Sequence, residues 1–228
     1  MPTETQTPQQ LWTAVDTYIS SQLIPSDAVL EAALAASTAA GLPQIAVSAP
    51  QGKQLHLLAL LMGARNILEI GTLGGYSTIW LARALPPGGH LITLEADPKH
   101  AEVAGANIAQ AGLSGVVELR QGRALDTLPQ ISEELRGPFD LIFIDADKEN
   151  IPQYFIWAMQ LSRRSSLILV DNVIRDGAVI DPANDDARIQ GVRRFNEMLA
   201  AEPRVAATTI QTVGNKGYDG FTMALVIA

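Results

Sequence analysis

From residue 66 onward, the chain alternates short apolar runs with longer segments of helical periodicity, and this alternation is its strongest constraint on fold. Such a pattern is typical of parallel strands joined by crossover helices. The predicted strands are residues 66–70, 90–94, 116–120, 139–144 and 167–170. We therefore expect an α/β fold built around a parallel sheet.

Signals at helix ends fit this pattern. Ser48, with Gln51 three residues later, is a capping box that begins a helix, and Gly63 is placed to end it. Asp97 followed by Pro98 forms a typical helix N-terminus after the second strand. These caps indicate that the segments beside the predicted strands are helices.

The two ends of the chain lie outside the alternating part. Residues 11–22 and 26–38 are predicted helices, which makes residues 1–45 a helical extension. Residues 205–213 and 221–227 are β-rich, and the glycines and asparagine between them favour a hairpin.

Composition narrows the class of protein. The 228 residues, 47% of them hydrophobic, suffice for one large core, and no linker marks a boundary, so we expect a single domain over residues 1–228. The 16 basic and 24 acidic residues give a net charge of −8, which disfavours nucleic acid as a partner. The sequence has no cysteine, which excludes thiolate metal sites and cysteine nucleophiles. It shows neither a secretory signal nor an apolar run near the ~20 residues that cross a bilayer, so we expect a cytoplasmic protein without a membrane partner.

A glycine-rich turn follows the first predicted strand. Gly71, Gly74 and Gly75 let the backbone pass close to a ligand, because glycine has no Cβ. Their spacing differs from the Gly-x-Gly-x-x-Gly pattern that receives a pyrophosphate in dinucleotide-binding folds. Glu69 comes just before the turn, and a carboxylate there would repel a pyrophosphate but suit a cationic amine.

Glu95 ends the second predicted strand, where an acid can accept hydrogen bonds from both hydroxyls of a ribose. A ligand with a ribose, an ammonium group and no phosphates fits Glu69 and Glu95 together. S-adenosylmethionine is such a ligand. The alternative is that the glycines form an ordinary tight turn and that Glu95 is a solvated carboxylate beside a helix cap.

Oxygen-bearing side chains follow two later strands. Asp145 comes directly after one, and Asp171 and Asn172 come directly after the next. If the two strands are neighbours, these side chains meet at one point, where two carboxylates and an amide suit a hard divalent cation. We expect magnesium, with manganese or calcium as alternatives. The competing interpretation is that these residues only form turns and cap the following helices.

Lys148 lies three residues after Asp145 and has two interpretations. It can pair with Asp147 or Glu149 on a solvated turn, a contact that contributes ~0 to 1 kcal/mol. Alternatively, a nearby divalent cation would lower the pKa of its ammonium, so that it could accept a proton from a substrate hydroxyl. The sequence alone does not separate the two.

Several motifs together resemble a known family. In chain order, they are LEIGTLGGYS, TLEADP, FIDADKEN, LILVDNV, RRFNEML and YDGFTMAL. This set resembles the cation-dependent O-methyltransferases of the catechol and caffeoyl-CoA type, especially the bacterial ones. The resemblance implies a Rossmann-like sheet of seven strands with helices on both faces, its last strand antiparallel, usually in a homodimer.

The resemblance also implies roles for individual residues. Lys148 is the implied general base, and the implied metal ligands are Asp145, Asp171 and Asn172. The implied contacts to S-adenosylmethionine are Val47, Glu69, Gly71, Ser77, Glu95, Ala124 and Asp145.

Together these features predict methyl transfer from S-adenosylmethionine to one hydroxyl of a catechol-like small molecule, dependent on a divalent metal. Three alternatives stay open at this point. Some bacterial relatives methylate a hydroxylated nucleoside in tRNA, although the net charge of −8 opposes this. A nicotinamide-dependent oxidoreductase is disfavoured by the glycine spacing. The third is a cofactor-binding domain without catalytic activity, which the presence of the acids and Lys148 opposes.

Overall fold

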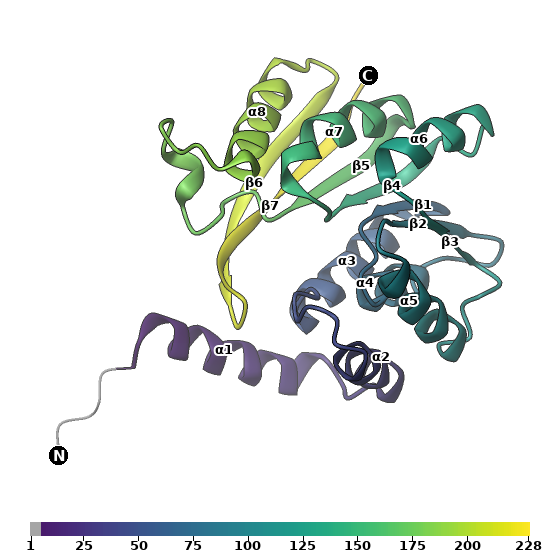
Figure 1. Cartoon of the computed structure of the whole chain (residues 1–228), viewed down its shortest axis with the longest axis vertical. Helices are drawn as coiled ribbons and strands as arrows, with labels where there is room; N and C mark the ends of the chain where they lie inside the picture. The colour runs from purple at the N-terminus through teal and green to yellow at the C-terminus, as the bar shows by residue number, and fades with distance from the viewer. Residues whose placement is uncertain (1–5) are drawn as a thin grey trace.

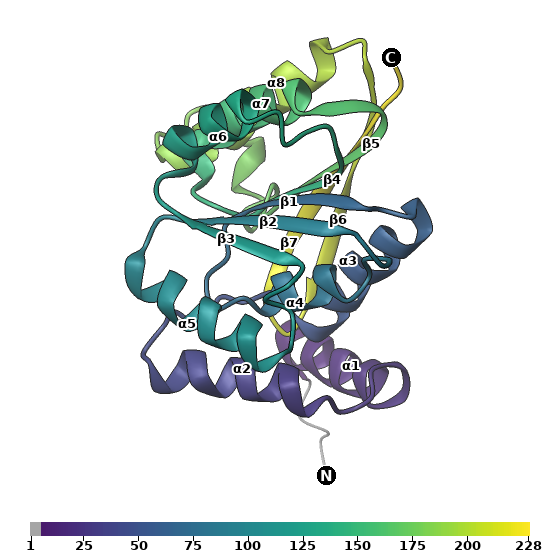
Figure 2. The ribbon, with the colours of Figure 1, turned by 90° about the vertical axis from the view of Figure 1, so that its right-hand side faces the viewer.

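A computed structural model of the chain describes residues 6–228 and shows one sheet of seven strands between two layers of helices (Figures 1 and 2). The strand order is β3-β2-β1-β4-β5-β7-β6. The strands are β1 (Asn66–Ile70), β2 (His90–Glu95), β3 (Val117–Gln121), β4 (Phe139–Ile144), β5 (Ser162–Asp171), β6 (Val205–Gly214) and β7 (Gly217–Val226).

The first five strands are paired in parallel, while β7 runs antiparallel to both β5 and β6. The predicted parallel sheet, terminal hairpin and antiparallel last strand are therefore confirmed. β5 begins five residues earlier than its predicted start at residue 167. Its first half, residues 162–166, is polar throughout and includes three exposed side chains, so it lacks the apolar signal by which the second half was predicted.

Helices cover both faces of the sheet (Figures 1 and 2). One face packs against α6, α7 and α8, and the other packs against α3, α4 and α5, with α2 beyond them. The helices are α1 (Pro8–Leu23), α2 (Ala28–Ala39), α3 (Ala49–Met62), α4 (Tyr76–Ala82), α5 (Pro98–Gln110), α6 (Ala124–Glu133), α7 (Ile151–Gln160) and α8 (Ala187–Ala201), with 3₁₀ turns η1 (Lys148–Asn150) and η2 (Ala178–Ile180).

The predicted caps form as the sequence indicated. Both hydrogen bonds of the capping box between Ser48 and Gln51 are present, and Gly63 ends α3 in the left-handed conformation with φ of 58°. The Asp97 side chain accepts hydrogen bonds from two backbone N–H groups at the start of α5. Local sequence therefore sets where these helices begin and end.

The predicted helical extension forms α1 and α2, and its first five residues lie outside the described part. α2 is seated on the body of the protein through buried Leu30 and Ala33. α1 has no buried residue and lies beside the tip of the β6–β7 hairpin (Figure 1). It is held there by hydrogen bonds from Gln9 to the carbonyl of Gly214 and from the Asn215 backbone N–H to Asp16.

The strand order places the site. β1 lies between β2 and β4, so the chain leaves β1 toward one side of the sheet and β4 toward the other, and ligands of open α/β sheets bind at such a switch point. Ile70 is level with Ile144, and Ile144 is level with Val170. Gly71 and Asp145, which follow β1 and β4, and Asp171, the last residue of β5, therefore emerge together at the carboxyl edge. Between residues 6 and 228, no helix combines the length and apolar character that a membrane span requires.

Candidate active site

The glycine turn and the fourth strand approach each other closely at this edge. Gly71 has φ of 101°, and a Cβ atom placed on it would lie 2.1 Å from the carbonyl oxygen of Asp145. The Asp145 backbone N–H donates to the carbonyl of Ile70 at 2.8 Å. A side chain at position 71 would therefore push the ends of β1 and β4 apart, which explains why glycine is needed there.

Asp145, Lys148 and Asp171 form a charged group at the ends of β4 and β5, in which Lys148 and Asp171 are buried and Asp145 is partly exposed. Lys148 Nζ donates to Asp145 Oδ1 at 2.7 Å, although only 8% of Lys148 is exposed. Burial raises the pKa of Asp171 to about 7, the negative charge of Asp145 adds to this rise, and Lys148 opposes it. One lysine is thus shared by two acids, and the group carries excess negative charge.

The interpretation of Lys148 as a solvated residue paired with Asp147 or Glu149 is wrong. Its ammonium points to Asp145 instead, and the Asp147 carboxylate accepts the hydroxyl of Tyr154. The alternative, a lysine poised inside the site, agrees with this placement.

Asn172 follows Asp171 with φ of 59°, a left-handed conformation that asparagine tolerates better than most residues. Its backbone N–H donates to Asp171 Oδ1 at 2.8 Å. The bend turns the chain at the end of β5, directly after Asp171. Interpreting these residues only as turn formers does not account for the burial of Asp171, which is 5% exposed.

The donor set fits a hard divalent cation. Buried carboxylates with excess negative charge are stabilised by a positive ion, and carboxylate and amide oxygens are the ligands that Mg²⁺ and Ca²⁺ prefer. Within residues 6–228, no group contains three or more His, Cys, Asp or Glu side chains arranged for a metal. The predicted set of two aspartates and one asparagine has only two such residues, so the metal site stays a prediction.

Glu69 is completely buried and its carboxylate is surrounded by hydroxyl groups. It accepts hydrogen bonds from Ser77 at 2.6 Å, from Thr93 at 2.7 Å and from Thr78. Burial raises the pKa of Glu69 to about 7, although the three hydroxyls act in the opposite direction. The carboxylate therefore ties the start of α4 to β1 and β2, and its direct contact with a cofactor ammonium stays a prediction.

Glu95 holds the glycine turn in place. One oxygen accepts the backbone N–H groups of Thr72 and Leu73, at 3.2 and 2.7 Å, and the other accepts the N–H of Asp97 at 2.9 Å. The interpretation of Glu95 as a solvated carboxylate is wrong, because the residue is 9% exposed. A carboxylate has about four acceptor positions, so three backbone bonds leave room for one further donor such as a ribose hydroxyl.

The other predicted cofactor residues lie at several points around this edge. Ser77 is in the first turn of α4, and Ala124 is the first residue of α6. Val47 lies just before α3 and lines a narrow cavity of about 20 Å³ that also reaches Asp171. The contacts of these residues to the cofactor stay a prediction.

Sequence reasoning missed Thr93, Thr78 and Asp219. The Asp219 carboxylate accepts the backbone N–H groups of Ile174 and Arg175 at 2.9 and 3.0 Å, so β7 fixes the loop that follows Asn172. Only the YDG motif around Asp219 pointed to this position. The two threonines are ordinary strand and helix residues in the sequence, and nothing local marks them as partners of Glu69.

Comparisons with known proteins agree with this geometry. A family model described as O-methyltransferase matches residues 19–227. A catechol O-methyltransferase of Niastella koreensis is 56% identical over 217 residues, covering 95% of this chain and 98% of the relative. The crystal structure of an O-methyltransferase from Bacillus cereus in complex with SAH superposes with a TM-score of 0.95 at 60% identity, covering 96% of this chain and 99% of the other. The O-methyltransferase TomG from Streptomyces achromogenes, in complex with SAM, gives a TM-score of 0.95 at 55% identity, covering 98% and 100%.

Proposed function

This chain belongs to the O-methyltransferase family, and we propose that it transfers the methyl group of S-adenosylmethionine to one hydroxyl of a vicinal diphenol with the help of a divalent cation. The observation that carries the proposal is the charged group of Asp145, Lys148 and Asp171 beside the glycine turn, whose acids outnumber its lysine. The 56% identity with a catechol O-methyltransferase supports the substrate class.

In this proposal, Asp145, Asp171 and Asn172 hold the cation, with magnesium preferred. When bound, the ion supplies positive charge that lowers the pKa of a phenol from its ordinary value of about 10. Lys148 Nζ, in its neutral form, accepts the proton of the substrate hydroxyl. The phenolate oxygen then forms a bond to the methyl carbon as the bond between carbon and sulfur breaks, which leaves S-adenosylhomocysteine.

The chain contributes positioning and exclusion of water. Lys148 is held at 2.7 Å from Asp145 and is 8% exposed, so its amine has few orientations available. A fixed, poorly solvated proton acceptor next to the reacting oxygen lowers the entropic part of the barrier. Contacts to the cofactor are assigned to Val47, Glu69, Gly71, Ser77, Glu95, Ala124 and Asp145.

The test is a set of diphenols and matched monophenols assayed with and without EDTA. We expect transfer only to the diphenols, loss of activity after chelation, and recovery with Mg²⁺. Undiminished transfer in EDTA would remove the metal from the proposal, and equal transfer to monophenols would remove the diphenol. S-adenosylhomocysteine binding, measured by calorimetry in EDTA, checks that the cofactor site stays intact.

We also propose a homodimer, in which α1 is covered by the partner subunit. Along α1, large apolar side chains face solvent, including Tyr18 at 67% and Leu23 at 69% exposure. Neighbouring α3 adds Leu60 at 50% and Leu61 at 83%. Exposed apolar groups of this size mark contact surfaces. Light scattering of wild type and of the variant with Tyr18→Ser and Leu23→Ser tests the dimer, because the variant should be monomeric. A monomeric wild type would refute the dimer.

A cytoplasmic location stays a prediction of the sequence.

A further inference from the structure

Gly191 lies in the second turn of α8, in direct contact with the turn that carries Lys148. A Cβ atom placed on Gly191 would lie 2.2 Å from the carbonyl oxygen of Lys148 and 2.7 Å from Cα of Glu149. Both atoms belong to the backbone, so no side-chain rotation would relieve the overlap. α8 and η1 therefore approach as closely as they do only because residue 191 is glycine.

Glycine at this position has a cost for the helix. In a helix interior, glycine is ~1 kcal/mol less favourable than alanine. Gly105 is the matched case in α5, where an added Cβ would meet nothing within 4 Å. Local helix stability thus favours alanine at both positions, whereas the contact with Lys148 opposes it at position 191 alone.

If the two elements were forced apart, η1 would move rather than α8. α8 is anchored by the buried side chains of Ile189, Val192 and Phe195, and Phe195 packs edge-on against Phe155 of α7 at 5.3 Å between ring centroids. η1 spans only three residues. The carbonyl that would be struck accepts the N–H of Ile151, so its displacement also disturbs the start of α7.

We propose that Gly191 is a positioning residue for Lys148. Because Gly191 has no side chain, the Lys148 backbone can lie directly against α8, and this sets the distance from Nζ to Asp145 and to the substrate oxygen. This inference rests on the proposed function of Lys148 as proton acceptor. Lys148 reaches Asp145 at 2.7 Å from within a buried turn, so a backbone shift of about 1 Å misdirects the amine, and misplacements of that size can lower rates ~100-fold.

The first experiment compares Gly191→Ala with Gly105→Ala, using catechol as methyl acceptor and saturating Mg²⁺. We expect kcat to fall about 10- to 100-fold in Gly191→Ala, with KM for S-adenosylmethionine changed less than ~2-fold. Gly105→Ala should keep the wild-type kcat. An unchanged kcat in Gly191→Ala, or a variant that does not fold, would overturn the proposal, the latter because it would make Gly191 a packing residue of the whole fold.

A double-mutant cycle separates action through Lys148 from general damage. In the Lys148→Ala background, Gly191→Ala should cost less than ~2-fold further in kcat, since the group that it misplaces is already gone. Additive losses would overturn the proposal. If Lys148→Ala keeps full kcat, the role of Lys148 as proton acceptor is refuted. If Lys148→Ala is inactive and Gly191→Ala keeps full kcat, only the positioning role of Gly191 is refuted.

A measurement without turnover completes the test. Amide hydrogen exchange should speed up at Ile151 in Gly191→Ala, because its acceptor is the carbonyl of Lys148, and should be unchanged there in Gly105→Ala. S-adenosylhomocysteine affinity in EDTA should stay within ~2-fold of wild type. Wild-type exchange at Ile151 in Gly191→Ala would show that η1 has not moved and would overturn the proposal.

Discussion

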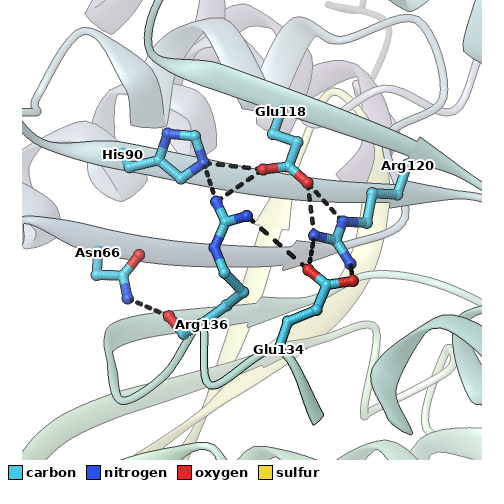
Figure 3. Close-up of polar contacts among 6 residues, drawn as sticks. All are labelled: Asn66, His90, Glu118, Arg120, Glu134 and Arg136. Carbon is cyan, nitrogen blue, oxygen red and sulfur yellow. Dashed lines mark hydrogen bonds and ion pairs between the residues drawn. The ribbon is translucent and has the colours of Figure 1, made fainter. Parts of the chain in front are cut away.

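Two charged clusters lie at opposite ends of the same sheet, and they differ in how fully their charges are paired. The acid cluster, at the carboxyl edge, consists of Asp145, Lys148 and Asp171. The edge network lies where β1 and β2 begin and along edge strand β3, and it is drawn in Figure 3 together with Asn66. Its members are His90, Glu118, Arg120, Glu134 and Arg136.

In the edge network, each acid contacts two arginines. Glu118 forms ion pairs with Arg120 at 2.6 Å and with Arg136 at 2.8 Å. Glu134 forms an ion pair with Arg120 at 2.5 Å and lies 3.9 Å from Arg136. Burial raises the pKa of Glu118, but Arg120, His90 and Arg136 outweigh it and leave the pKa below its ordinary value. Two acids and two arginines thus balance without a ligand.

The acid cluster lacks this balance. Lys148 is its single cation, while Asp171 is buried beside Asp145 and within the influence of Asp219, so that its pKa rises to about 7. In a paired cluster the charges stabilise one another in the folded chain, whereas an unbalanced buried cluster costs stability unless a ligand compensates it. Charge balance, rather than the number of charges, is therefore what supports our proposal that the acid cluster binds a ligand and the edge network does not.

The largest expected effect comes from neutralising the unbalanced acid. Asp171→Asn should lower kcat on catechol at least ~100-fold, because the proposed cation would lose a carboxylate ligand. In EDTA at pH 8, the same variant should be more stable than wild type by about 1 to 2 kcal/mol, since it no longer buries an excess charge. Urea unfolding and initial rates measure both.

The control for this change is Glu102→Gln, which neutralises an exposed carboxylate on α5. It should alter neither kcat nor the free energy of unfolding. An Asp171→Asn protein that is both inactive and less stable in EDTA would contradict the assignment of Asp171 as an acid whose burial costs stability.

The second expectation concerns pH, for which the two clusters should act with opposite sign. The pKa of Asp171 is raised to about 7, so its contribution to stability is fully present below its unfolded pKa of about 4 and is lost as pH rises through about 7. The lowered pKa of Glu118 means that its contribution is present above its unfolded pKa of about 4.5 and is lost as pH falls.

Unfolding free energies between pH 4 and 7.5 in EDTA check this. Relative to wild type, Asp171→Asn should gain stability as pH rises, while the deficit of Glu118→Gln should grow over the same range. Glu69, whose pKa is also about 7, is present in all three proteins and cancels in the differences. Parallel profiles for the two variants would contradict the opposite charge balance of the two clusters.

The third expectation is that the edge network affects stability alone. Arg120 joins both acids and its side chain is 14% exposed, so Arg120→Ala leaves two carboxylates without their main partner. We expect a loss of about 1 to 2 kcal/mol in unfolding free energy, allowing for the partial exposure of Glu118 and Glu134. Initial rates should match wild type when the protein is folded; a tenfold fall in kcat would show that the network reaches the site.

Local sequence predicted much of the fold because strands and helices here follow their own periodicity and caps. β1 and β4 were predicted with their observed bounds, since both are short apolar runs buried on two faces. The first half of β5 was missed because Arg163, Arg164 and Ser165 are exposed and polar. Its strand state depends on its continuity with the buried half, which propensity does not register.

Residues of the site could be predicted where their position at the end of one strand places them. Contacts between segments that are distant in the sequence could not be predicted. Asp145, Asp171 and Asn172 were predicted to lie together because all three stand at the carboxyl ends of two apolar strands, and the structure places those strands side by side. The burial of Lys148 depends on the approach of α8 at Gly191, and the environment of Glu69 depends on Thr93 of β2. Such contacts arise from tertiary packing, and no pattern of neighbouring residues encodes them.

The smallest expected effect tests which part of Arg136 the edge network uses. Its guanidinium donates to Glu118 at 2.8 Å and its side chain is 35% exposed, while its backbone carbonyl accepts Asn66 Nδ2 at 2.9 Å (Figure 3). Arg136→Lys keeps the charge and the carbonyl contact and loses only the forked geometry. We therefore expect a change of less than about 0.5 kcal/mol in urea unfolding, which is typical of exposed ion pairs. A loss above that of Arg120→Ala would mean that Arg136, and not Arg120, is the central cation of the network.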